Sequence, residues 1–120
     1  MLEFLKQLFR PAPSGADRRR GLRVEAPEDT ALVSLDGASY PIKNWSAHGF
    51  LAGAYSGQRA IGDKCVARID IRQDPFAIAF ATEVVIVRRD GGDLAGRFVS
   101  LPPENKAQVD AYFAFHARML

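Results

Sequence analysis

Hydrophobic and polar residues alternate along most of the chain after residue 22. The clearest case is residues 64–72, where alternate apolar side chains would share one face and charged residues the other (Cys65, Ala67, Ile69 and Ile71 against Lys64, Arg68, Asp70 and Arg72). A period of two is typical of a half-buried β-strand. Shorter or longer runs of this kind predict further strands at residues 31–35, 39–43, 49–53, 76–88 and 94–101, and the length of 76–88 favours a bulge.

Turn signals separate these predicted strands. Asp36-Gly37 and Asp90-Gly91-Gly92 follow two of them, and both predict tight hairpins because glycine accepts positive φ. Asp74-Pro75 interrupts another pair, and residues 54–63 are small and glycine-containing, which predicts a loop. Several short strands joined by close turns indicate a mainly β protein, either a small antiparallel barrel or a sandwich.

Both ends of the chain have helical periodicity instead. Residues 1–10 carry apolar side chains at three- and four-residue spacings and predict a short amphipathic helix, followed by a Pro/Ser/Gly-rich linker. Residues 104–120 follow Pro102-Pro103 and predict a longer helix whose apolar stripe packs on the core (Val109, Tyr112, Phe113 and His116). We therefore expect an arm of residues 1–17 and one domain of residues 18–120. The short helix has three candidate docking surfaces: this protein or a second copy, a partner, or a membrane surface.

Charge is concentrated at the start of the chain. The net charge is +2, but residues 1–23 carry six Lys and Arg against two acidic residues, so +4, which leaves −2 for the remainder. This distribution favours a localised anion site over a general nucleic-acid surface. No apolar run approaches the ~20 residues that span a bilayer, and residues 1–10 are too short for a secretory signal. We expect a soluble cytoplasmic protein.

Catalytic and metal chemistry have little support in the sequence. The single cysteine, Cys65, lies in a strand-like run and is expected to be buried. His48 and His116 are far apart and have no cysteine partners, so we predict no metal site and no cofactor. No nucleophile–base pair or phosphate-binding glycine loop is present, so we do not expect an enzyme.

Two short segments carry the candidate binding chemistry. Residues 18–23 contain four arginines, whose planar, permanently charged guanidinium suits phosphate recognition and can stack on a base. Residues 44–49 form a predicted polar turn between two apolar runs, with Asn44 and Ser46 as short-range hydrogen-bonding groups and Gly49 permitting a tight backbone. Alone, each segment is as well explained by a solvated basic arm or an ordinary turn.

The two segments together resemble the motifs of the PilZ domain, the bacterial cyclic di-GMP receptor family. Arg19 and Arg23 form R-x-x-x-R, and Asn44, Ser46 and Gly49 form the later [D/N]-x-S-x-x-G, in the order that the family has. The resemblance extends from about Arg18 to the chain end. It implies a small six-stranded antiparallel β-barrel with a C-terminal helix, and a receptor that signals to an unknown protein partner as a monomer or homodimer.

The resemblance also implies roles for single residues. Arg19 and Arg23 would bind phosphate and guanine, while Asn44 and Ser46 would hold the other face of the ligand and Gly49 would fix the loop. In the family, an arginine at the position of Arg18 accompanies the binding of two intercalated cyclic di-GMP molecules, so two per chain are expected here. Arg20 occupies a variable position and is expected in solvent.

Two positions depart from the commonest family pattern. Asn44 replaces Asp, a variant the family tolerates. His48 replaces a frequent second glycine. His tolerates positive φ better than most residues, so the turn can be kept, and we expect the His48 side chain either to face solvent or to line the ligand pocket. Trp45 between them is expected in the core.

Two other functions remain open on the sequence. A barrel of the same family serving only as a ligand-independent protein adaptor would not need the intact arginines and Asn-x-Ser-x-x-Gly. A small OB-like barrel that binds single-stranded nucleic acid should interleave aromatic and basic residues on its strands, whereas the basic residues cluster here on one arm.

Overall fold

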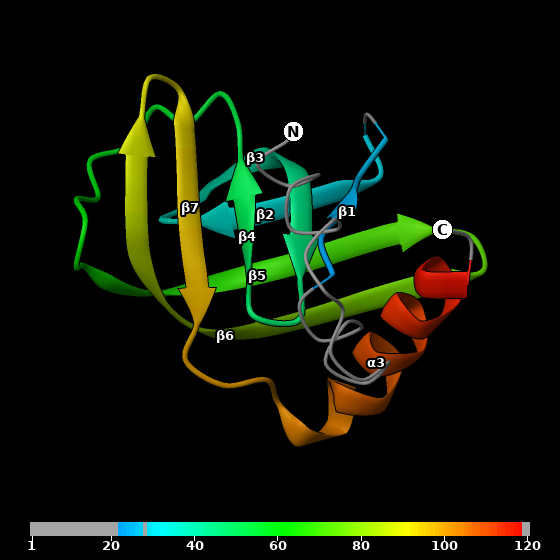
Figure 1. Ribbon diagram of the computed structural model, residues 1–120. Helices are drawn as coiled ribbons and strands as arrows, with labels where there is room; N and C mark the ends of the chain where they lie inside the picture. Colours follow the sequence, from blue (N-terminus) through cyan, green and yellow to red (C-terminus); the bar gives the residue numbers. More distant parts are fainter. Residues whose placement is uncertain (1–21, 28, 119–120) are drawn as a thin grey trace, which may run out of the picture.

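The computed structural model describes residues 22–27 and 29–118 (Figure 1). It contains seven strands and one helix: β1 (Val24–Glu25), β2 (Ala31–Leu35), β3 (Ala38–Ser46), β4 (Gly49–Ala52), β5 (Lys64–Gln73), β6 (Phe76–Asp90), β7 (Asp93–Phe98) and α3 (Pro103–Arg118). The predicted N-terminal helix and linker of residues 1–17 lie outside the described residues. Among these residues, no helix is long and apolar enough to cross a membrane.

Six antiparallel strands close into a barrel, as the resemblance implied. Hydrogen-bonded neighbours follow the order β3-β2-β5-β6-β7-β4, and β4 pairs again with β3. The remaining strand, β1, was not predicted; it pairs antiparallel with the last part of β3 beside the region where β2 pairs. The first part of β3 therefore pairs with β2, and its end carries β1 on one side and β4 on the other (Figure 1).

The end of β3 differs from the prediction. Asn44, Trp45 and Ser46 belong to the strand, and the turn to β4 consists only of Ala47 and His48. An irregularity in the β3–β4 register between Ile42 and Asn44 places an extra residue at position 43. This bulge shifts the alternation, so that Ile42 and Trp45 are both buried although three residues apart.

β6 and α3 close the other side of the barrel. β6 pairs with β5 from its first residue but with β7 only from Val84 onward, and its predicted bulge lies between Ile86 and Arg88. α3 lies beside the early part of β6 (Figure 1), where Asn105 Nδ2 and Gln108 Nε2 donate to the backbone oxygens of Ala79 (3.3 Å) and Ala77 (3.4 Å). The helix thereby covers a strand edge that would otherwise expose unpaired backbone groups.

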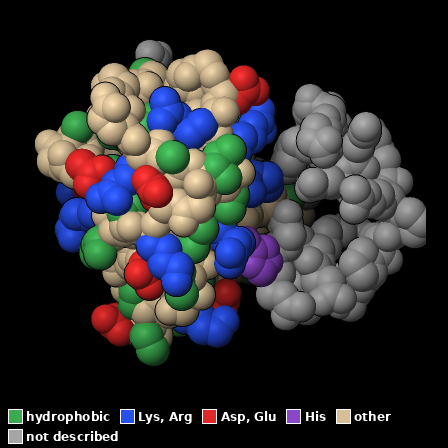
Figure 2. All heavy atoms as spheres, turned by 90° about the vertical axis from the view of Figure 1, so that its left-hand side faces the viewer, with side chains coloured by type: hydrophobic (Ala, Val, Ile, Leu, Met, Phe, Trp, Pro, Cys, Tyr) green, Lys and Arg blue, Asp and Glu red, His purple; other side chains and the backbone are tan. Residues whose placement is uncertain are grey.

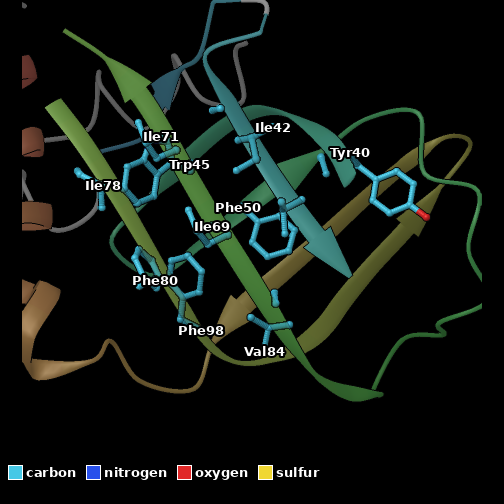
Figure 3. Packing of buried hydrophobic residues seen from close by; sticks show 14 of the residues in the cluster. Tyr40, Ile42, Trp45, Phe50, Ile69, Ile71, Ile78, Phe80, Val84 and Phe98 are labelled. Atoms are coloured by element: carbon cyan, nitrogen blue, oxygen red, sulfur yellow. The ribbon is translucent and has the colours of Figure 1, made fainter. Parts of the chain in front are cut away.

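The core fills the barrel with side chains from every long strand. In Figure 3, aromatic and aliphatic side chains from β3 to β7 point toward one another, among them Trp45, Phe50, Ile69, Phe80 and Phe98. α3 adds Tyr112 and Phe113, whose rings lie 5.1 and 4.6 Å from that of Trp45 between centroids.

Most side chains that the sequence places in the core are buried. Trp45 and Cys65 are buried as expected. Of the predicted helical stripe, Val109, Tyr112 and Phe113 are buried, whereas His116 is only half-buried. The His116 ring lies on that of Tyr112, with 4.3 Å between centroids, so it extends the aromatic cluster rather than filling the core.

Candidate functional site

Arg23 joins the two sequence motifs at the edge of the barrel. Its Nε donates a 2.7 Å hydrogen bond to Asn44 Oδ1, and its Nη1 lies 3.4 Å from Ser46 Oγ as a second donor. The β1–β3 register pairs Val24 with Trp45, so its continuation places Arg23 opposite Ser46. Three of the predicted ligand-binding residues are therefore brought together.

The local sequence explains why these side chains meet. Leu22 and Val24 are buried, so Arg23 between them is directed to the outer face. Trp45 is likewise buried, and Asn44 and Ser46 on either side of it are directed outward. The short strand β1, too brief to recognise in the sequence, is what aligns these two sets of residues.

Ser46 also fixes the turn that follows it. Its Oγ accepts a 3.1 Å hydrogen bond from the backbone N–H of His48, two residues later, while it accepts from Arg23. Ser46 is 2% exposed, so both bonds are shielded from water. One hydroxyl oxygen thus joins the β3–β4 turn to the arginine.

The positive charge of Arg23 is left without an opposite charge in the described part of the chain. Burial lowers the pKa of the Arg23 guanidinium, which nevertheless stays protonated because arginine titrates far above neutral pH. No carboxylate within residues 22–27 and 29–118 forms an ion pair with it. Asn44 orients the guanidinium through a neutral amide oxygen where Asp would neutralise it. An anion that reached Arg23 would therefore meet a positioned cation that no described carboxylate neutralises.

Gly49 is required by a close approach of two strands. A Cβ built at this position would lie 3.0 Å from the Cα of Arg97 and would overlap the carbonyl oxygen of Gly96 on β7. The φ of Gly49 lies outside the left-handed region. Glycine is therefore needed here for the close contact with β7 and not for a left-handed backbone conformation.

The turn at His48 is kept without positive φ. Among the described residues, the non-glycine positions with positive φ are Asp29, Asp36 and Ala54. Bonding to Ser46 and pairing with β7 hold the turn without it, since the His48 carbonyl oxygen accepts from the Phe98 N–H at 2.8 Å. The His48 side chain is exposed, which leaves either expected position open to it.

A further basic residue, Arg97, adjoins the motif residues and was not singled out from the sequence. The β4–β7 register pairs it with Gly49, and Gly49 pairs in turn with Ser46. Alternation in β7, where Leu94, Gly96 and Phe98 are buried, shows that position 97 faces outward. The alternation can be read from the sequence, but the pairing of β7 with β4, which brings Arg97 beside Gly49, cannot.

The other predicted site residues lie outside the described part. Arg18, Arg19 and Arg20 precede residue 22, so only the second arginine of R-x-x-x-R is placed. Within the described ranges, no group of three or more His, Cys, Asp or Glu residues is arranged to hold a metal ion.

Comparisons with known proteins support the architecture but assign no family. No family model and no curated protein matches the chain. The crystal structure of an uncharacterized Legionella protein, Lpg0364, is similar over 82% of this chain and 92% of its own, with a TM-score of 0.53 and 16% sequence identity. That likeness shows the fold alone.

Proposed function

We propose that the chain is a cyclic di-GMP receptor of the PilZ type that passes the signal to a protein partner in the cytoplasm. The observation that carries the proposal is the Arg23 guanidinium, held by Asn44 and Ser46 on the outer face of the barrel. These are members of the two motifs that resemble the PilZ family. Their meeting supports the interpretation that the motifs form one site.

The chemistry of the ligand matches this arrangement. Cyclic di-GMP presents two phosphates and two guanines, and a guanidinium can pair with phosphate oxygens or with guanine O6 and N7. A side chain already held by two hydrogen bonds loses less conformational freedom on binding. Arg18 and Arg19 directly precede this site in sequence and supply the further cations that two stacked ligand molecules would need.

The described surface favours a small anionic ligand over single-stranded nucleic acid. Sequence-tolerant binding of single strands uses exposed aromatic rings as stacking platforms, and every described aromatic side chain is buried or half-buried. Figure 2 shows Lys and Arg side chains on one face with Asp and Glu among them. Several basic side chains of the described part form ion pairs, including Arg59 with Asp36 and Lys43 with Asp93.

Isothermal titration of Arg23→Ala and wild type with cyclic di-GMP tests the proposal. The substitution removes charge-assisted bonds worth about 1.5–3 kcal/mol, so affinity should fall about ten- to a hundredfold. The matched control is Arg72→Ala, an exposed arginine on β5 that pairs with Asp70. It should bind like wild type, and circular dichroism should show that both variants remain folded.

The alternatives give different results in the same titration. A wild-type chain that binds no cyclic di-GMP would favour a ligand-independent adaptor. Equal affinity for cyclic di-AMP, or tighter binding of single-stranded DNA, would favour a nucleic-acid-binding barrel. If Arg23→Ala and Arg72→Ala both bind like wild type, the ligand lies elsewhere on the protein.

A further inference from the structure

Arg97 lies in the same cross-strand row as Arg23, on the opposite side of the motif. Register partners run from Ser46 through Gly49 to Arg97 across β3, β4 and β7, and Arg23, which directly precedes β1, lies opposite Ser46 when the β1–β3 register is continued. Neighbouring strands lie about 4.7–4.9 Å apart, so three spacings separate the two arginine backbones by roughly 14 Å. Two long, flexible cationic side chains thus flank a short stretch of sheet.

The residues between the two arginines have small side chains. Ser46 contributes one small side chain, which Arg23 already contacts, and Gly49 contributes none. In the next row, Asn44 pairs with Leu51 and Leu51 with Ala95, so larger side chains border Ser46 and Gly49 on that side. The described strands therefore place no large side chain between Arg23 and Arg97, although Ser46 and Gly49 are both buried in the structure.

The packing of β7 keeps Arg97 at this distance from the motif. The missing side chain of Gly49 lets the backbone of Gly96 and Arg97 approach β4, as the overlap of a Cβ there demonstrates. The 2.8 Å bond from the Phe98 N–H to the His48 carbonyl oxygen ties the same part of β7 to the turn. The motif glycine and the position of Arg97 are therefore structurally linked.

Among the described residues, Arg97 has no partner. It is exposed, and within residues 22–27 and 29–118 it forms no ion pair or side-chain hydrogen bond. Arg72 and Arg88, by contrast, are engaged by Asp70 and Asp90. An exposed guanidinium with no acidic partner in the described ranges, beside the motif residues, suits a phosphate or a guanine edge.

We propose that Arg97 is a further ligand-binding residue of this site and contacts the part of cyclic di-GMP farthest from Arg23. The inference rests on the proposed function, because it assigns Arg97 to the same ligand. Arg23 and Arg97 then hold the ligand from both sides, over Ser46 and Gly49. This assignment extends the site beyond the two sequence motifs to β7.

Calorimetric titration of Arg97→Ala with cyclic di-GMP tests the assignment. We expect an affinity loss of about ten- to a hundredfold, from the removal of charge-assisted bonds. Arg97→Lys should recover part of it, because the charge remains but the planar fork is lost. The matched control is Arg68→Ala, which removes the same charge from an exposed, unpaired position on β5, two strands from β7, and should bind within twofold of wild type.

The outcomes separate the inference from the proposed function. If wild type binds and Arg23→Ala does not, while Arg97→Ala binds like Arg68→Ala, the site is correct and Arg97 is not part of it. Equal losses in Arg97→Ala and Arg68→Ala would show a general charge effect and would also overturn the assignment. A wild-type chain that does not bind cyclic di-GMP overturns both proposals.

Discussion

Replacing Gly49 by alanine perturbs the contact between β4 and β7 with a single methyl group. Its Cβ would lie 3.0 Å from the Arg97 Cα and would overlap the carbonyl oxygen of Gly96. Both neighbours are backbone atoms of a paired strand, so relief requires β7 to move rather than a side chain to rotate. We therefore expect Gly49→Ala to destabilise the fold and to displace Arg97 from the motif.

The size of the effect follows from the packing. Forcing extra volume into a well-packed region costs about 1–3 kcal/mol of unfolding free energy. In a domain of this size, 1 kcal/mol lowers Tm by roughly 4–8 °C, so a fall of about 4–24 °C is expected. Gly92→Ala is the matched control, because a Cβ there would meet its nearest atoms, N and Cα of Ala54, at 3.7 and 3.8 Å, which is ordinary contact.

Thermal unfolding followed by circular dichroism, with urea unfolding as a second method, measures both variants. Gly92→Ala should change the free energy of unfolding by no more than about 0.5 kcal/mol. At a temperature where Gly49→Ala is folded, its affinity for cyclic di-GMP should also be lower than that of Gly92→Ala. Equal unfolding free energies in the two variants would refute the close approach as the reason for glycine at this position.

Two smaller predictions concern groups that orient the site and close the barrel. Asn44→Ala frees the Nε of Arg23 and should weaken cyclic di-GMP binding about two- to tenfold by calorimetry, through the loss of one hydrogen bond; unchanged affinity would show that Asn44 does not position the arginine. Burial raises the pKa of Tyr112, so the folded protein retains a proton that the unfolded chain loses near pH 10. The free energy of unfolding should therefore decrease as pH rises above about 10, more steeply in wild type than in Tyr112→Phe, and parallel pH profiles would contradict this assignment.

The sequence predicts the strands that alternate regularly. β5 has four buried residues at alternate positions, and β6 contains the expected bulge, so both were recognised from pattern alone. The six-stranded barrel came from the family resemblance rather than from the pattern, which also allowed a sandwich. Closure depends on the pairing of β4 with β7, which joins residues far apart in the chain.

The site was only partly predictable for the same reason. The motif pattern identified Arg23, Asn44 and Ser46, which the structure brings into contact. β1 has two residues and exists because it pairs with β3, so no local pattern could define it. The irregularity before Asn44 reset the alternation and made strand residues resemble a turn. Arg97 could be identified as a candidate only from the structure, because the pairing of β4 with β7 places it beside Gly49.

A titration of ¹⁵N-labelled protein with cyclic di-GMP, followed by amide chemical shifts, tests the central proposal most directly. We predict saturable shifts at Arg23, across residues 44–49 and at residues 96–98, with little change along the middle of β5. These segments are neighbours at one end of the barrel, so their shifts should follow a common binding curve. Absence of saturable shifts, or shifts centred on β5, would contradict cyclic di-GMP binding at this site.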